Sequence, residues 1–180
     1  MAKRVLLLRG GSLGRNTGLG AAHHNLVDLL ESGKVDGWQL AGICEYPLEK
    51  TSNPISRIWQ RWFAHPKRVA KEINRLVSNN QCDLVHITDQ EQGHLMPKNC
   101  PVPGIITVHD LFHLFPEHLR FSDEVIAVGD TKPGIVRRRD LQKLKAGINR
   151  ANHLLCNSKH TLEAAEPVSY THLRAHETPL

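Results

Sequence analysis

A short segment in the middle of the chain ends in two residues that could act on a ligand. Gly104 to Asp110 reads G-I-I-T-V-H-D, a β-branched strand pattern followed by the imidazole of His109 and the carboxylate of Asp110. Ligands of open α/β sheets bind in the crevice beyond the carboxyl ends of the strands, which is where these two side chains would lie. A histidine at the end of a strand can also be satisfied by a backbone carbonyl, and this alternative stays open.

A glycine-rich loop follows the first predicted strand. Its glycines are Gly10, Gly11, Gly14, Gly18 and Gly20. The loop lacks the G-K-[ST] of a P-loop and the third glycine of a dinucleotide fingerprint, which argues against ATP and NAD as ligands. Glycines still let the backbone approach a ligand closely, and a helix that begins near Gly18 directs N–H groups and its positive dipole end at an anion. A flexible surface loop is the alternative.

The order of apolar patterns predicts an α/β fold. Continuous apolar runs typical of buried parallel strands lie at residues 4–9, 39–46, 83–88, 104–109 and 153–157. A helix is expected between each pair of successive strands, and the span 112–132 shows no clean period. This order predicts a Rossmann-like, doubly wound parallel sheet with helices on both faces. The glycine loop and the segment ending in Asp110 should therefore open onto the same edge of one sheet.

Local signals place several helix ends. Asn53 and Pro54 form an N-cap followed by proline at the first helical position, and Pro66 is expected to start a second helix. Gly33 is placed to end the helix after the glycine loop. Ser158 is expected to cap the helix that follows the fifth strand.

Length and composition indicate one ordinary globular domain. The chain has 180 residues, of which 40% are hydrophobic and 23% charged, and its net charge is +5. No apolar run approaches the roughly 20 residues that span a bilayer, and the start does not read as a secretory signal, so a cytoplasmic protein is expected. The cysteines form no C-x-x-C pair, which indicates separate reduced thiols rather than a zinc site or disulfides. They are Cys44, Cys82, Cys100 and Cys156.

The last residues differ in character from the rest of the chain. From Pro167 the sequence P-V-S-Y-T-H-L-R-A-H-E-T-P-L has neither helical nor strand periodicity and resembles the translated read-through of a sequencing adaptor. We therefore expect a truncated domain over residues 1–166 and a non-native or disordered tail over residues 167–180. An ordinary disordered terminus is the alternative.

Four segments in order resemble the N-terminal half of a GT-B glycosyltransferase of the family 4 type. They are G-L-G at 18–20, V-H-I-T-D at 85–89, T-V-H-D-L at 107–111 and R-A-N-H-L-L-C-N-S-K-H-T at 150–161. The resemblance covers about residues 3 to 166. It implies two Rossmann-like domains that face each other across a cleft, with this domain holding mainly the acceptor.

The resemblance also implies a reaction and a set of site residues. Such enzymes transfer a sugar from a nucleotide-diphosphate donor to an acceptor hydroxyl with retention, without a required metal or other cofactor. Gly18 and Gly20 would lie against the donor diphosphate and the acceptor entrance. His109 would hydrogen-bond the donor sugar and favour an oxocarbenium-like transition state, and Asp110 would steady that loop.

Three polar residues after the third strand are candidates for acceptor contacts. Asp89, Gln90 and His94 could reach acceptor hydroxyls, and they fit an ordinary polar loop equally well. The expected partners are a nucleotide-sugar donor and a glycan or lipid-linked acceptor, with no nucleic acid. The residues that grip the donor belong to the second domain of the family, so we expect this chain to be inactive by itself.

An aromatic and basic segment raises the question of a membrane contact. Trp59, Trp62 and Phe63 alternate with basic residues and could form an interfacial surface for a lipid-linked acceptor at the inner face of the membrane. The favoured alternative is an amphipathic helix that packs on the sheet and exposes its basic face. The basic residues are Arg57, Arg61, Lys67, Arg68 and Lys71. The run Arg137 to Arg139 is expected to be solvated.

Two other functions remain alternatives. One is a metal-dependent hydrolase that uses His109, Asp110, His113 and a further ligand in His118, although H-D-x-x-H matches no helical zinc motif. The other is a flavodoxin-like module that binds a small anion through the glycine loop without catalysis.

Overall fold

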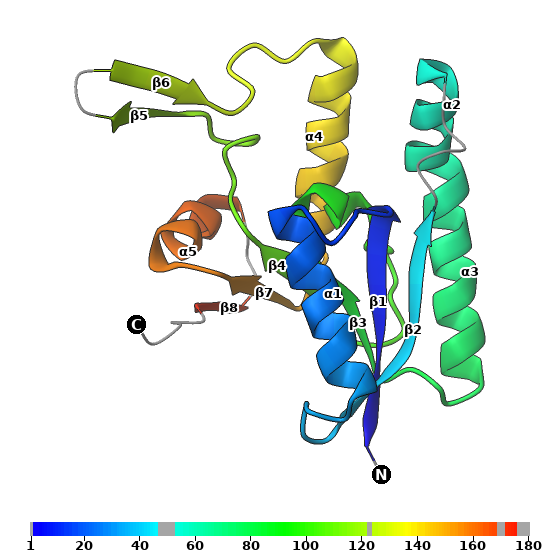
Figure 1. The fold of residues 1–180 in the computed structure, drawn as a ribbon. Helices are drawn as coiled ribbons and strands as arrows, with labels where there is room; N and C mark the ends of the chain where they lie inside the picture. The colour runs from blue at the N-terminus through cyan, green and yellow to red at the C-terminus, as the bar shows by residue number, and fades with distance from the viewer. Residues whose placement is uncertain (1, 47–52, 122–123, 169–171, 176–180) are drawn as a thin grey trace.

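The computed structural model describes residues 2–46, 53–121, 124–168 and 172–175, and its central feature is one parallel sheet. Six strands lie in the order β2-β1-β3-β4-β7-β8, and each neighbouring pair is parallel (Figure 1). The strands are β1 (Lys3–Gly11), β2 (Trp38–Tyr46), β3 (Leu84–Ile87), β4 (Gly104–Val108), β7 (His153–Cys156) and β8 (His172–Ala175). All five predicted strands are present, so the predicted α/β fold class is confirmed.

Helices cover both faces of this sheet (Figure 1). The α-helices are α1 (Gly18–Glu31), α2 (Pro54–Trp59), α3 (His65–Ser78), α4 (Ile135–Ile148) and α5 (Lys159–Ala165). The shorter turns are the π-helical η2 (Gln60–Ala64) and the 3-10 helices η3 (Gln90–Leu95) and η4 (Glu166–Val168).

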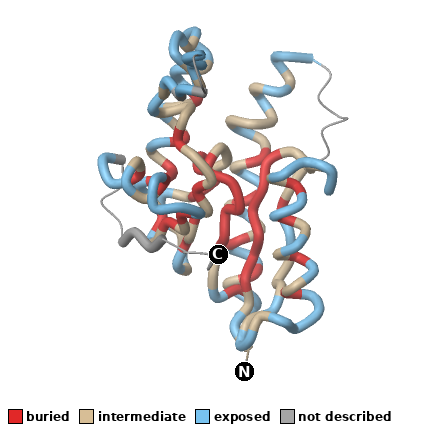
Figure 2. Tube along the Cα trace, turned by 60° about the vertical axis from the view of Figure 1, so that its left-hand side comes forward, coloured by how far each residue is buried: buried red, intermediate tan, exposed pale blue. Residues whose placement is uncertain are grey.

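Strand β1 shows why two helical layers form. Its apolar run is continuous, so alternate side chains enter different cores. Val5 and Leu7 pack with residues of α1, whereas Leu6 and Leu8 pack with residues of α3 and α4. The central strands are the most buried part of the chain (Figure 2). The sheet therefore holds the carboxyl ends of β1, β3 and β4 side by side.

The predicted helix ends are confirmed by their hydrogen bonds. Asn53 caps α2 by accepting from the Ile55 N–H, and Ser158 caps α5 by accepting from the Thr161 N–H. Gly33 follows α1 with a φ of 68°, a conformation that favours glycine. Pro66 lies in the first turn of α3, as expected, although η2 joins α2 and α3 into one continuous helical segment.

Two expectations about connections are wrong. The span 112–132 contains an antiparallel hairpin, β5 (Glu117–Phe121) and β6 (Glu124–Val128), that stands away from the central sheet (Figure 1). Because residues of β6 such as Val125 and Ile126 are exposed, this strand lacks the inside-outside alternation that would have revealed it. The crossover from β3 to β4 uses only η3 rather than an α-helix, and three prolines between 97 and 103 follow it.

The aromatic segment also differs from the favoured expectation. Helix α2 has no buried residue and extends past the carboxyl edge of the sheet, so it does not pack on the sheet (Figure 1). Trp59 is 61% exposed and Phe63 is 52% exposed, and their rings lie 5.3 Å apart. An apolar pattern predicts a packed face only where the helix has sheet beneath it.

Four residues of the predicted tail form an edge strand. β8 pairs with β7 in parallel register, from His153 with His172 to Cys156 with Ala175. Such pairing uses backbone groups, so it does not depend on side-chain periodicity. Whether residues 167–180 are native stays a prediction.

Candidate functional site

The start of α1 lies at the carboxyl edge of the sheet and contains two glycines, Gly18 and Gly20, that differ in how closely other atoms surround them. Thr17 caps the helix, since its Oγ1 accepts from the Gly20 N–H at 3.0 Å. A Cβ on Gly20 would collide with the Gly14 carbonyl, whereas a Cβ on Gly18 would meet open space. Gly20 is therefore needed to close the loop. The N–H groups of Gly18 and Leu19, which have no acceptor within the helix, are left for a ligand or water.

His109 is held at the end of β4 by two hydrogen bonds. Its N–H donates to Oε1 of Gln90 at 2.9 Å, and its Nε2 lies 3.1 Å from the carbonyl oxygen of Thr88. Because a carbonyl only accepts, Nε2 carries the proton and the Nδ1 of a neutral ring is an acceptor. The carbonyl contact matches the alternative left open above. A ring fixed in this way accepts from a ligand hydroxyl rather than donating to it.

Asp110 and His109 line a small cavity between the end of β4 and the start of α5. The cavity has a volume of about 220 Å³, and its wall includes Phe112, Phe115 and Ser158. Asp110 Oδ1 accepts from the Phe112 N–H at 3.3 Å, which steadies the loop around the cavity. The cavity walls do not include Gly18, Gly20 or Asp89.

One residue joins the start of α1 to His109. Thr88, which follows β3, bonds His23 of α1 through Oγ1 at 3.0 Å and His109 through its carbonyl at 3.1 Å. Since β1 and β4 are parallel strands of one sheet, the glycine loop and His109 open onto the same edge, as predicted.

Arg9 is a residue of this edge that the sequence analysis treated only as part of a strand. It is 2% exposed, its Nη1 reaches the Leu19 carbonyl at 3.5 Å, and its Nη2 has no hydrogen-bond partner among the described residues. Burial lowers the pKa of Arg9, and the charge of Asp89 opposes this. The guanidinium adds positive charge beneath the start of α1. Its signal in the sequence was a cation at the end of an apolar strand, next to the glycine loop.

The three polar residues after β3 lie in different surroundings. Asp89 is buried and caps η3 by accepting from the Glu91 N–H at 2.9 Å, and burial raises its pKa. The side-chain oxygen of Gln90 accepts the hydrogen bond from the His109 N–H. His94 lies in another cavity, beneath α4. Of the three, Asp89 is the one whose charge acts on Arg9 at this edge.

The run Arg137 to Arg139 is not uniformly solvated. Arg137 bonds Glu91, Asp130 and Asp140 at 2.7–3.1 Å, so the prediction is wrong for this residue. Asp140 also accepts from Arg61 and from the Trp62 indole N–H at 2.8 and 2.9 Å. This cluster ties η2 to the start of α4.

The hydrolase alternative has no support in this geometry. His113 contacts Asp130 through Nδ1 at 3.2 Å and Glu91 through Nε2 at 3.6 Å, so the two carboxylates lie on opposite sides of its ring, and both bind Arg137. Within residues 2–46, 53–121, 124–168 and 172–175, no three histidine, cysteine or acidic side chains lie close enough together to hold a metal ion. The four cysteines are free thiols, as expected.

An apolar groove lies between α2 and the start of α4. It has a volume of about 520 Å³, and Ile58, Trp62, Ile135 and Val136 supply its apolar lining. The Arg61, Asp140 and Arg137 side chains form its polar part. No helix of the described residues is long and apolar enough to cross a bilayer.

Comparison with solved structures finds proteins that share this architecture. The UDP-glucose:anthocyanidin 3-O-glucosyltransferase in complex with UDP matches with a TM-score of 0.53 and 13% identity, over 96% of this chain and 52% of that one. UGT2 of Phytolacca americana matches with a TM-score of 0.56 and 10% identity, over 98% of this chain and 52% of that one. A UDP-glucosyltransferase from Polygonum tinctorium matches with a TM-score of 0.53 and 12% identity, over 97% of this chain and 51% of that one. The chain has the Rossmann-like domain of the GT-B fold.

These matches concern the fold. No protein-family model and no curated protein matches the sequence. The chain spans about half the length of the solved structures that it matches. The family 4 subtype that the motifs resemble stays a prediction.

Proposed function

We propose that this chain is the acceptor-side half of a glycosyltransferase of the retaining, family 4 type. The observation that carries the proposal is the meeting of two features at one sheet edge. Thr88 connects the helix that presents the amides of Gly18 and Leu19 with the imidazole of His109. The likeness of the fold to UDP-glucosyltransferases supports glycosyl transfer as the reaction, and the family 4 subtype and retention rest on the sequence motifs.

Each residue of the edge has a part in the proposed reaction. The Gly18 and Leu19 N–H groups, with Arg9 beneath them, favour the donor diphosphate. His109 Nδ1 accepts a hydrogen bond from a hydroxyl of the donor sugar, which holds the imidazole near the reacting carbon. Asp110 steadies the His109 loop, and Asp89 lies near the acceptor hydroxyls. No metal or other cofactor is proposed, and the donor-gripping groups would come from a second domain.

The aromatic segment gives the acceptor a location. We propose that Trp59 and Phe63, beside the apolar groove, face a lipid-linked acceptor at the cytoplasmic surface of the membrane. Both rings are exposed on an element that extends past the sheet, and the net charge of +5 suits acidic lipid.

Replacing Trp59 with serine tests this membrane contact. We expect the variant to bind anionic vesicles about tenfold more weakly, because a buried aromatic side chain contributes about 1.5–3 kcal/mol. Vesicle flotation measures the effect, with Val125→Ser on the exposed hairpin as the control. Equal flotation of Trp59→Ser and the unmodified chain would remove the membrane contact from the proposal.

Replacing His109 with alanine tests the transferase function. We propose that a second Rossmann-like domain completes the donor site, so the assay uses this domain together with its donor-binding partner domain. We expect kcat/KM for sugar transfer to fall about 100-fold, the usual effect of deleting one polar group that stabilises the transition state. His113→Ala is a matched control, because His113 lies on the same loop but pairs with Asp130.

Two results would contradict the transferase proposal or its details. Full activity in a folded His109→Ala variant would remove His109 from the site, and no transfer with any nucleotide sugar would favour a non-catalytic anion-binding module. Transfer by the 180-residue chain alone would show that the second domain is not required. The anomeric configuration of the product decides between retention and inversion.

A further inference from the structure

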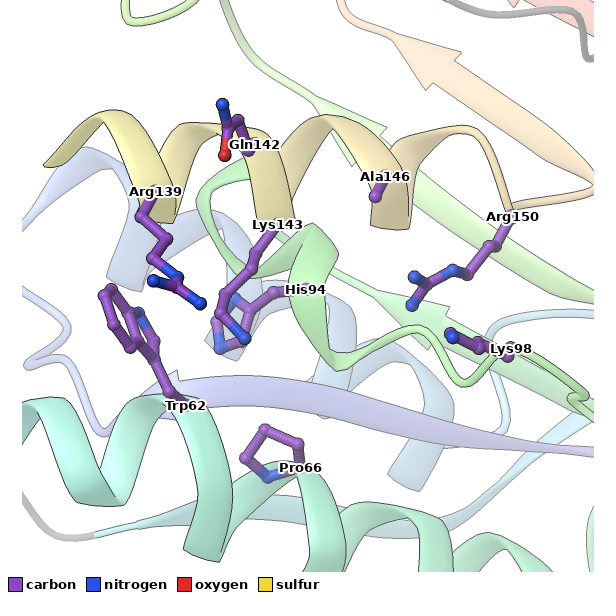
Figure 3. Close-up of a pocket in the computed structure, with 9 residues that line it drawn as sticks. All are labelled: Trp62, Pro66, His94, Lys98, Arg139, Gln142, Lys143, Ala146 and Arg150. Atoms are coloured by element: carbon purple, nitrogen blue, oxygen red, sulfur yellow. The ribbon is translucent and has the colours of Figure 1, made fainter. Parts of the chain in front are cut away.

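A second cavity lies beneath α4, away from the His109 cavity, and its lining is strongly basic. Its volume is about 440 Å³, and it is bounded by α4, α3, η2 and the segment after η3 (Figure 3). Lys98, Arg139, Lys143 and Arg150 contribute four cations, and none of the lining residues carries a carboxylate. The other lining residues are Trp62, Pro66, His94, Gln142 and Ala146.

His94 is a buried polar side chain in the wall of this cavity. It is 9% exposed, and neither ring nitrogen has a hydrogen bond of good geometry within the described residues. Against the larger effect of burial, the Arg61 carbonyl lies near enough to raise the pKa of the ring. A buried polar group without a well-formed hydrogen bond is unfavourable. An anionic ligand in the cavity would offer the imidazole an acceptor.

Tight packing fixes His94 in this position. A Cβ on Gly147 of α4 would collide with the carbonyl of Gly93, so only glycine permits this approach of α4 to η3. The imidazole is thereby held beside the cavity, and it lies among the basic side chains in Figure 3.

The four cations are positioned but not neutralised. Arg150 donates to the Met96 carbonyl at 3.1 Å, and the Lys143 ammonium lies 5.4 Å from the Trp62 ring and 5.7 Å from the Phe63 ring. The ion pairs among the described residues include none with Lys98, Arg139, Lys143 or Arg150. Asp140, the nearby acid, is held by Arg61 and Arg137.

We propose that this cavity is a phosphate-binding site, separate from the sugar-transfer edge, for a phosphate monoester or diphosphate group. Arg139 and Lys143 lie near His94 at one end of the cavity, and Lys98 and Arg150 lie together at the other end (Figure 3). Four cations without a carboxylate match a multiply charged anion. Burial lowers the pKa of His94 to about 3, so the ring is neutral and presents one donor. The site does not depend on the transferase function.

Calorimetric titration of the 180-residue chain with pyrophosphate at low ionic strength tests the proposal. We expect the double variant Arg139→Gln/Lys143→Gln to bind about tenfold or more weakly, since it removes two charge-assisted contacts. The double variant Arg138→Gln/Lys145→Gln is the matched control, because it removes the same charge from exposed positions of α4 outside the cavity. Equal weakening in both variants, or no binding by the unmodified chain, would overturn the site.

A second measurement protects the test from changes in folding. Saturation with pyrophosphate should shift the imidazole NMR resonances of His94 in the unmodified chain, and unshifted resonances at saturation would overturn the site. Flotation with phosphatidate vesicles then separates the two sources of phosphate. If pyrophosphate releases the unmodified chain from the vesicles but has no such effect on Arg139→Gln/Lys143→Gln, the site binds a lipid headgroup. If the chain binds pyrophosphate but not the vesicles, the site binds a free phosphate compound.

Discussion

Replacing Asp140 with alanine is expected to lower the free energy of unfolding by about 3–5 kcal/mol, the usual cost of removing one partner of a buried ion pair. Asp140 is 7% exposed and receives hydrogen bonds from Arg61, Trp62 and Arg137. Burial opposes ionisation of this carboxyl, but the bonds from Arg61 and Trp62 outweigh it and lower the pKa below 3.8. Without the carboxylate, the Arg61 and Arg137 guanidiniums would repel each other between η2 and α4.

Urea unfolding at pH 7 measures this effect. Asp28→Ala is the control, because Asp28 pairs with Arg15 through two hydrogen bonds of similar length but is exposed. We expect the control to change stability far less, since solvent screens exposed pairs. Because the pKa of Asp140 is lowered on folding, its contribution is present above pH 3.8 and is lost as the pH falls further. Equal losses in the two variants would show that the cluster does not hold α4.

Acidification from pH 7 to pH 5 is expected to remove several kcal/mol of stability, well before carboxyl groups titrate. Burial is the largest cause that lowers the pKa of His23, His65 and His86 to about 4, and that of His94 to about 3. The unfolded chain binds these protons near pH 6.5, so it gains protons that the folded chain does not. Linkage gives a loss of roughly 1–2 kcal/mol for each ring by pH 5.

The slope of stability against pH between 7 and 5 measures this loss. His23→Gln should flatten the slope by removing one of the four rings. His24→Gln is the control, because His24 is the next residue of α1 and is only partly buried, with a bond to the Leu13 carbonyl. Stability that stays constant from pH 7 to pH 5 would show that these imidazoles take up protons in the folded protein.

Local signals explain which features could be predicted from the sequence. The strand patterns and the caps at Asn53 and Ser158 depend on neighbouring residues, and the structure has them where expected. The strands β5 and β6 were not predicted because they stand away from the core, and packing against a core is what makes apolar and polar residues alternate along a strand. The packing of Trp59 was misjudged because amphipathicity does not say whether a sheet lies beneath a helix.

The amino-acid sequence by itself determined five strands of the central sheet and the residues that follow them, including His109 and Asp110. Only the tertiary structure decided which of these residues meet. Thr88 bridges α1 and the end of β4, Gly20 closes the loop against the Gly14 carbonyl, and His94 lines a basic cavity. The reason is physical. Hydrophobic period and capping act within a few residues, whereas a site forms from side chains far apart in the chain, whose meeting depends on strand order and on how closely helices approach the sheet.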